Sequence, residues 1–185
     1  MATGTTLITA EEFMELCEEY DGLCELVRGE IQEMTRPSTE HGLVCGNLAY
    51  ELGHWIRKGH PGFLVTNDAG VLTERDPDTV RGPDLYFVSE QRLPKQRGRR
   101  GWMEVPPDHC VEVLSPSDRW KDVLDKVTEY LTFGVPEVWV TDPDTQHLHF
   151  FRPDSEPLLL SGAAEVSSAR LPGFCAPASR FFEGC

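Results

Sequence analysis

Apolar residues along the chain alternate between the three-to-four-residue spacing of helices and the two-residue spacing of strands. The pair Thr9 and Glu12 has the spacing of a capping box and predicts a helix that continues to Tyr20. Ser38 is a candidate cap for a second helix, whose apolar residues recur at helical spacing until Gly59. The first third of the chain therefore predicts two helices.

Runs rich in β-branched and aromatic residues, bounded by glycine, proline or aspartate, predict several short strands. LCELV and EIQEM form a predicted hairpin around Arg28 and Gly29, and EVWVTD and HLHFFR form a second hairpin. Further strands are predicted at GFLVT, GVLT, DLYFV and HCVEVLSP, and the tail with LPGF and SRFF is predicted to form a final short strand or helix. Because helices and strands are interleaved, we expect one domain over 1–185 of the α/β (mixed α+β) class, with a central mixed β-sheet flanked by helices and added β-hairpins.

Composition is typical of a globular protein in the cytoplasm. Hydrophobic residues make up 39% of the 185 positions, and no apolar run approaches the ~20 residues of a membrane span. The first residues have neither a basic start nor a long apolar stretch, so we expect no secretory signal and a cytoplasmic location. The six cysteines include no CxxC pair, which argues against a zinc site or a disulfide framework and favours thiols without a catalytic role.

The strand predicted at 108–114 contains a carboxylate in an otherwise apolar sequence. Side chains alternate along a strand, so Glu112 shares one face with Cys110 and Leu114, while Val111 and Val113 point to the other face. Burying an ionised carboxylate costs several kcal/mol unless it is paired with a cation or binds a metal. Glu112 therefore requires a partner.

A third helix, predicted over 117–133 with Gly134 as its stop signal, supplies that partner. At about 100° per residue, Lys126 falls inside the apolar face of this helix, whereas Lys121 lies opposite it. Glu112 lies about 15 Å back along its strand from the turn, and Lys126 lies about 13–14 Å into the returning helix. The two side chains are thus expected to meet, either in a catalytic site or in a purely structural Lys–Glu pair.

Asp84 is a second candidate acid, because it opens the apolar strand in GPDLYFV just after the Gly82-Pro83 turn. An aspartate beside proline commonly stabilises a turn, which is the alternative role for this residue. Two carboxylates together, however, are a typical ligand set for Mg²⁺, which completes its coordination with water and substrate oxygens. Asp84 and Glu112 are therefore candidate metal ligands.

The ordered set of these motifs resembles the Uma2 family of putative restriction endonucleases, within the PD-(D/E)XK nuclease superfamily. The resemblance rests on Pro83-Asp84, on EVLSP from Glu112, on the K-x-x-x-Y spacing from Lys126, on GVPEVW-x-x-DP, and on CELVRGEI, STEH and LPGF. It implies a restriction-endonuclease-like sheet. The usual superfamily pattern places lysine two residues after the glutamate, where this chain has Leu114, and Lys126 on the helix takes that place.

The resemblance also implies roles for individual residues. Asp84 and Glu112 would ligate Mg²⁺ or Mn²⁺, with the Val113 carbonyl as a further oxygen ligand. Lys126 would orient the attacking water or stabilise negative charge on the phosphate. Glu25 would hold a second metal or its water. His41 would bond the scissile phosphate or orient Glu25, although a structural or surface histidine is an equal alternative.

The formal charge of -14 argues against strong DNA binding, because phosphate contacts dominate the affinity of nucleic-acid-binding proteins. The segment RLPKQRGRR provides the exception, with candidate phosphate contacts at Lys95, Arg97, Arg99 and Arg100, unless this run is merely solvated. We expect weak, salt-sensitive DNA binding by a homodimer that cuts both strands. The alternatives are a noncatalytic interaction module with the same fold, or a hydrolase of RNA or smaller phosphodiesters.

Replacing Arg97, Arg99 and Arg100 together with alanine is expected to weaken duplex DNA binding equally for all sequences, because phosphate contacts do not distinguish bases. Each lost contact should flatten the slope of log affinity against log salt by roughly 0.9. Fluorescence anisotropy at several salt concentrations measures both effects. Strong binding by the triple variant with an unchanged slope would show that the segment is only a solvated surface.

Overall fold

A computed structural model describes residues 7–19, 22–93 and 101–185. The helices are α1 (Ala10–Glu19), α2 (Thr39–Arg57), α3 (Trp120–Phe133) and the 3-10 helix η1 (Ala178–Phe182). The strands are β1 (Leu23–Val27), β2 (Glu30–Met34), β3 (Gly62–Thr66), β4 (Val71–Glu74), β5 (Thr79–Arg81), β6 (Leu85–Ser89), β7 (His109–Val113), β8 (Val138–Asp142), β9 (His147–Phe151), β10 (Leu158–Ser161), β11 (Glu165–Ser168) and β12 (Leu171–Pro177).

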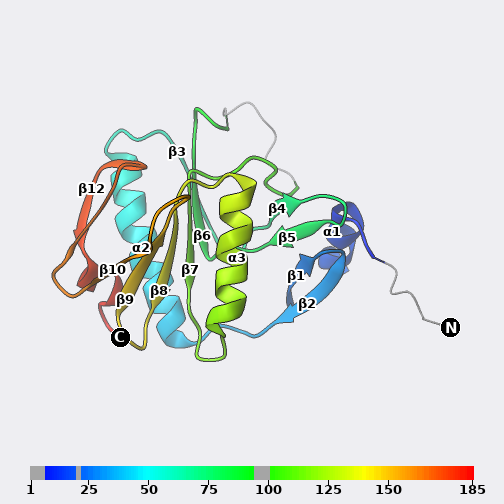
Figure 1. The fold of residues 1–185 in the computed structure, drawn as a ribbon, viewed down its shortest axis with the longest axis horizontal. Coiled ribbons are helices and arrows are strands. Elements are labelled where there is room, and N and C mark those ends of the chain that lie inside the picture. The colour runs from blue at the N-terminus through cyan, green and yellow to red at the C-terminus, as the bar shows by residue number, and fades with distance from the viewer. Residues whose placement is uncertain (1–6, 20–21, 94–100) are drawn as a thin grey trace.

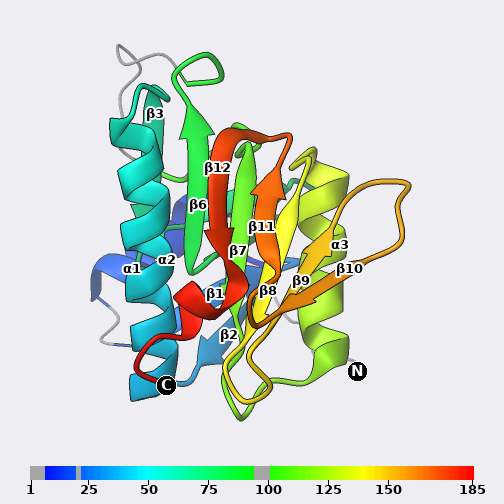
Figure 2. The same ribbon diagram turned by 90° about the vertical axis from the view of Figure 1, so that its left-hand side faces the viewer.

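A six-stranded sheet in the order β10-β9-β8-β7-β6-β3 forms the centre of the fold. It is a mixed sheet, because β7 pairs in parallel with β8 while its other neighbours pair antiparallel. Figures 1 and 2 show α3 on one face of this sheet, and α2 with the β11-β12 pair on the opposite face. The predicted class, a mixed sheet flanked by helices with added hairpins, is confirmed.

The residues of β7 divide between the two cores on either side of this sheet. Val111 and Val113 pack in the cluster that contains the buried side chains of α2, whereas Cys110 packs with those of α3. Glu112 is therefore directed to the α3 face, as the alternation of side chains predicts. This register brings a carboxylate to the surface on which a helix packs.

A second sheet, in the order β2-β1-β5-β4, lies to one side of the central sheet and is covered by α1 (Figure 1). The capping box is confirmed, since the Thr9 amide donates to Glu12 Oε2 (2.8 Å) and the Glu12 amide donates to Thr9 Oγ1 (3.2 Å). The predicted hairpin is also confirmed, and its turn has positive φ at both Arg28 (51°) and Gly29 (78°). The capping box and the hairpin turn, both read from the sequence, therefore predict the bounds of β1 as the structure has them.

The third helix begins at Trp120 rather than at residue 117, so the predicted start is wrong. The Asp118 carboxylate accepts from the Ser115 amide (2.7 Å), and the Asp118 amide donates to the Ser115 carbonyl (2.9 Å). A closed turn thus occupies the residues expected in the first helical turn.

Among the described residues, no helix combines the length and apolar character of a membrane span.

The sequence pattern did not predict three of the strands, β5, β10 and β11. β5 has three residues, all buried, including Arg81, and so shows no alternation. β10 is largely exposed and pairs only with β9, at the edge of the central sheet. The tail forms β12 followed by η1, so it contains both of the elements that were considered for it.

His109 is completely buried at the start of β7, and neither ring nitrogen has a hydrogen-bond partner within the described part of the chain. Its ring meets Trp139 edge-on, with 4.3 Å between centroids. Burial lowers the pKa of His109 to about 4, although the nearby carboxylates of Glu137 and Asp108 oppose the shift. The folded protein therefore holds this imidazole neutral.

Acid should destabilise the fold through His109. Between pH 6.5 and about 4 the unfolded chain binds a proton that the folded chain does not, so the free energy of unfolding falls as pH falls. His109→Phe should remove about 2–3 kcal/mol of the loss between pH 7 and 4.5. Urea unfolding of both proteins across this range measures the difference, and parallel pH profiles would contradict it.

Candidate active site

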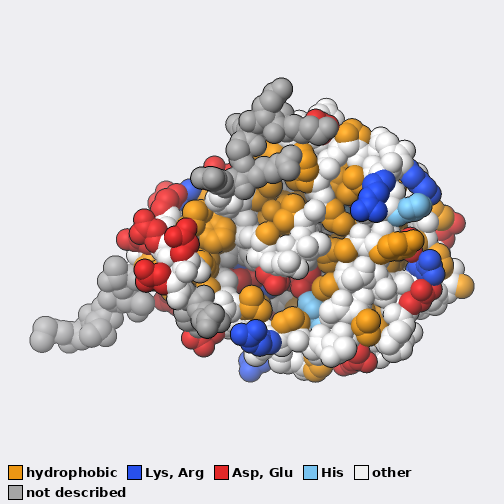
Figure 3. Space-filling model, turned by 180° about the vertical axis from the view of Figure 1, so that it is seen from behind, with side chains coloured by type: hydrophobic (Ala, Val, Ile, Leu, Met, Phe, Trp, Pro, Cys, Tyr) orange, Lys and Arg blue, Asp and Glu red, His pale blue; other side chains and the backbone are white. Residues whose placement is uncertain are grey.

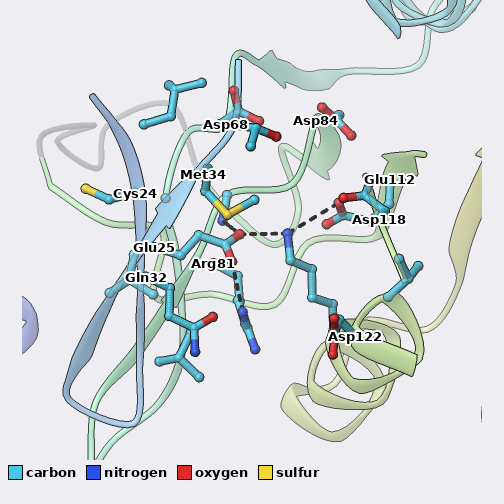
Figure 4. A pocket seen from close by; sticks show the side chains of 18 of the residues that line it. Cys24, Glu25, Gln32, Met34, Asp68, Arg81, Asp84, Glu112, Asp118 and Asp122 are labelled. Atoms are coloured by element: carbon cyan, nitrogen blue, oxygen red, sulfur yellow. Dashed lines mark hydrogen bonds and ion pairs between the residues drawn. The ribbon is translucent and has the colours of Figure 1, made fainter. Parts of the chain in front are cut away.

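A pocket of about 960 Å³ opens between the β1-β2 hairpin, the start of β6, the end of β7 and the inner side of α3. Glu25, Asp84, Glu112 and Lys126 all line it. Figure 4 shows the side chains of Glu25 and Glu112 on opposite sides of this pocket, and the ammonium of Lys126, from α3, forms an ion pair with Glu25. Most of the candidate metal-binding and catalytic residues therefore line one cavity, although they come from separate elements of the fold.

Lys126 lies between two carboxylates. Its Nζ is 2.9 Å from Glu25 Oε1 and 3.7 Å from Glu112 Oε2, which confirms the predicted approach of Lys126 to Glu112. Burial acts to lower the pKa of Lys126, but Glu112 and Glu25 outweigh it and hold the pKa above its ordinary value. Lys126 is therefore a cation throughout the physiological pH range.

Glu25 is surrounded by donors. Besides Lys126, Arg81 Nη1 lies 2.8 Å from Oε2, and the Gly82 amide donates to Oε1 (3.0 Å). Arg81 in turn forms two hydrogen bonds to Glu129, of 2.6 and 2.8 Å. Burial acts to raise the pKa of Glu25, but Lys126 and Arg81 reverse the effect and hold it below its ordinary value. Glu25 is an ionised carboxylate that fixes two cations.

Glu112 has a different environment. The Tyr130 hydroxyl donates to its Oε1 (2.6 Å), which leaves Oε2 on the side of Lys126. Burial raises the pKa of Glu112 to about 8; Lys126 opposes this shift, and Asp84 and Glu25 add to it. The carboxyl group thus lies where negative charge accumulates, and a divalent cation would relieve that repulsion.

Asp84 is held between β7 and α2. Its Oδ2 accepts from the Val113 amide (2.7 Å), and its Oδ1 lies 3.0 Å from His41 Nε2. The hydrogen bond to Val113 keeps Asp84 beside the strand residue that follows Glu112. His41 contacts Asp84 and does not bond Glu25, so the expectation that it orients Glu25 is wrong.

Sequence reasoning missed two residues that line the pocket, Arg81 and Asp68, and the buried Tyr130, which bonds Glu112 from α3. Burial, together with the charge of Asp84, raises the pKa of Asp68 to about 6. Tyr130 could have been identified, because the K-x-x-x-Y spacing places it one turn after Lys126 on the same face. Arg81 and Asp68 show no such pattern, since their partners are distant in sequence.

The cationic segment lies outside the described residues at Lys95, Arg97, Arg99 and Arg100. Arg92, just before it, is engaged within the protein, with Nε 2.7 Å from Asp108 Oδ1 and Nη1 donating to the Pro106 carbonyl (3.0 Å). Figure 3 shows one face of the molecule, with acidic side chains gathered at its α1 end. The Lys and Arg side chains on this face form separate groups, most of them away from that end. The described surface therefore repels polyanions around α1.

The mixed sheet and the two carboxylates beside a lysine are features of the nuclease class. The model of the Uma2 family, described as "Putative restriction endonuclease", matches residues 10–179. The chain belongs to this family, because the match spans most of its length. Among solved structures, "a putative nuclease belonging to DUF820 from Anabaena variabilis ATCC 29413" has the same fold, with a TM-score of 0.80 and 21% identity over 95% of this chain and 97% of that chain. No protein of curated function matches the sequence.

The buried pair of Glu25 and Lys126 should show strong energetic coupling. Glu25→Gln and Lys126→Met are each expected to lower the free energy of unfolding by about 3 kcal/mol, because each removes one of the close partners of a buried charge. The double variant should lose less than the sum of the two single losses, by more than about 1 kcal/mol. Urea unfolding of all four proteins completes the cycle.

Lys121 and Asp125 provide a matched control on the same helix. Their ion pair is 2.6 Å long but lies on the solvent side, with side chains 80% and 58% exposed. Solvent screening should make its coupling much smaller than that of the buried pair. Equal coupling in the two cycles would contradict the importance of the buried network.

Proposed function

We propose that this protein is a metal-dependent endodeoxyribonuclease in which Asp84 and Glu112 hold Mg²⁺ or Mn²⁺ and Lys126 assists the hydrolysis of a phosphodiester. The observation that supports this most directly is the position of the Lys126 ammonium, 3.7 Å from Glu112 in the pocket that Asp84 also lines. A purely structural pair would need only Lys126 and one carboxylate. The pocket contains that pair and further carboxylates, among them Asp84 and Glu25.

The residues present fit a hard divalent cation. Asp84 and Glu112 supply carboxylate oxygens, and the carbonyl of Val113, the residue after Glu112 in β7, is our candidate for a further ligand. The hydrogen bond from the Val113 amide (2.7 Å) positions the Asp84 carboxylate. Burial is the main cause of the raised pKa values of Glu112 and Asp68, and repulsion from neighbouring carboxylates adds to it, a repulsion that a bound cation would relieve.

When bound, the cation would polarise the phosphate and lower the pKa of a water molecule. Lys126 would act as a hydrogen-bond donor, because its raised pKa prevents it from accepting a proton near neutral pH. Two of its three N–H groups face Glu25 and Glu112, and the third can donate to water or to a phosphate oxygen. Lys126 thus stabilises negative charge that develops during the reaction.

Glu25 and His41 would be positioning residues. Glu25 holds Lys126 at 2.9 Å and is already engaged by Arg81, an environment better suited to fixing the ammonium than to binding a second metal. His41 holds Asp84 through the 3.0 Å contact of Nε2 with Oδ1. Each residue would act on the reaction through its neighbour.

The family supports DNA as the substrate, and we propose that a homodimer cuts both strands. The acidic surface favours weak, salt-sensitive association with DNA, in which Lys95, Arg97, Arg99 and Arg100 would make the phosphate contacts. The same net charge of -14 favours a second candidate, a hydrolase of RNA or a small phosphodiester. Substrate assays distinguish the two candidates.

Supercoiled plasmid incubated with the protein and Mg²⁺ or Mn²⁺ should be nicked and linearised. Asp84→Asn and Glu112→Gln should lower the rate by at least roughly 10²-fold, and chelation should abolish it. Glu183→Gln is the matched control, because it removes a carboxylate that is 59% exposed and does not line the pocket, and it should leave the rate unchanged. An RNA strand and a chromogenic phosphodiester, assayed in parallel, test the second candidate.

Titration calorimetry with Mn²⁺ tests whether a variant that loses nuclease activity has also lost metal binding. Glu112→Gln should abolish Mn²⁺ binding while the melting temperature falls by less than about 4 °C, because the amide relieves repulsion from Asp84 and Glu25. A large drop in melting temperature with unchanged metal affinity would instead indicate a structural role. Absence of metal binding by the parent protein would favour a noncatalytic module.

A further inference from the structure

A second set of potential metal ligands lies at the edge of the proposed active site, where α2 meets the start of β6. His41 and Cys45 are four residues apart on α2, so they occupy the same face of the helix. Cys45 Sγ is 3.5 Å from His41 Nδ1, and Asp84 Oδ1 is 3.0 Å from His41 Nε2. One ligand atom from each of the three residues lies within 4.8 Å of the other two.

A shared ion would bind only one nitrogen of His41, and the three ligand atoms, within 4.8 Å of one another, would have to move slightly closer together to match a tetrahedral zinc site. With bonds of about 2.0–2.1 Å to nitrogen and oxygen and about 2.3 Å to sulfur, neighbouring ligand atoms around zinc are about 3.4–3.6 Å apart. The 3.0 Å between His41 Nε2 and Asp84 Oδ1 is slightly shorter and lies within hydrogen-bond range. Asp84 would stay anchored through Oδ2, which accepts from the Val113 amide. A different χ1 rotamer of Cys45 would close the remaining gap.

The ligand types differ from those of the proposed catalytic site. Asp84 and Glu112 offer oxygen atoms, which suit Mg²⁺ and Mn²⁺, whereas a set of imidazole, thiolate and carboxylate selects zinc or another thiophilic ion. Burial raises the pKa of the Cys45 thiol, and the charges of Asp84 and Asp68 add to this effect. The surroundings thus disfavour an isolated thiolate but attract a divalent cation, which displaces the thiol proton on binding. Asp68 and Asp84 lie together on one side of the pocket (Figure 4).

We propose that His41, Cys45 and Asp84 form a binding site for Zn²⁺ that inhibits the enzyme. Asp84 belongs to both ligand sets, so Zn²⁺ bound by His41 and Cys45 withdraws this carboxylate from the Mg²⁺ site. The inhibitory effect rests on the proposed nuclease function, whereas the binding of Zn²⁺ by the three residues does not. The two statements are therefore tested by separate measurements.

Cobalt is the probe for binding, because Co²⁺ replaces Zn²⁺ and gives a thiolate charge-transfer absorption when sulfur is a ligand. Full-length reduced protein titrated with Co²⁺ should develop this absorption, and Zn²⁺ should remove it by displacement. Cys45→Ser should abolish the absorption and weaken Zn²⁺ binding, measured by calorimetry, by roughly tenfold or more. His41→Gln should weaken Zn²⁺ binding similarly. Mn²⁺ affinity should be unchanged in Cys45→Ser, because serine removes no ligand of a hard ion.

Cys24→Ser is the matched control. Cys24 Sγ lies 4.0 Å from Cys17 Sγ, so these two thiols are the other pair from which a cobalt signal could arise. The absorption should be retained in Cys24→Ser and lost in Cys45→Ser. Loss in Cys24→Ser alone, or no absorption in the parent protein, overturns the site. Cys45→Ala, checked by thermal unfolding, separates a lost ligand from a damaged fold.

Inhibition is measured as plasmid cleavage at fixed Mn²⁺ and increasing Zn²⁺. The parent protein should lose activity, and Cys45→Ser should need roughly tenfold more Zn²⁺ for the same loss. Equal inhibition of the two proteins, despite cysteine-dependent Zn²⁺ binding, would overturn the inhibitory role. If the parent protein cleaves no phosphodiester at all, the proposed function fails, and the cobalt spectrum still decides whether the site exists.

Discussion

The buried ion pairs around Lys126 are the constraint on which the arrangement of the pocket depends. Ionised groups are stable away from water only with partners at short range, so Glu25, Arg81 and Lys126 must lie together once each is buried. These residues come from β1, β5 and α3, which belong to the small sheet and to the helix on the central sheet. The same contacts that satisfy the charges therefore hold the small sheet against α3 and form the walls of the pocket.

The position of the lysine shows why a site is defined by geometry and not by sequence spacing. Leu114, two residues after Glu112, packs partly buried on the α3 side of the sheet, where it contributes to the core. The ammonium approaches Glu112 from α3 instead, because the helix runs back along the strand and this brings Lys126, near the middle of the helix, level with Glu112. Charge near a phosphate requires a cation at the right point in space, and either element can supply it.

Asp84 connects three parts of the molecule and so carries more than one role. Through Val113 it is fixed to the central strand, and through His41 it meets α2, on which Cys45 lies one turn further along. The oxygen atoms of Glu112 on one side of this carboxylate and the thiol and imidazole on the other side suit two chemically different classes of metal ion, as proposed above. In the two proposals above, this one carboxylate would serve both metal sites, so the ion that occupies it would determine whether the pocket is active.

The sequence by itself determined the features that depend on neighbours within a few residues. These include the Thr9–Glu12 cap, the β1-β2 turn, the alternation along β7 and the meeting of Glu112 with Lys126, since strand rise and helix rise are constant. Only the tertiary structure decided the partners that are far apart in the chain, such as Arg81 with Glu25 and His41 with Asp84. No local period encodes those contacts, because they arise when separate elements pack and each buried charge must find the nearest opposite one.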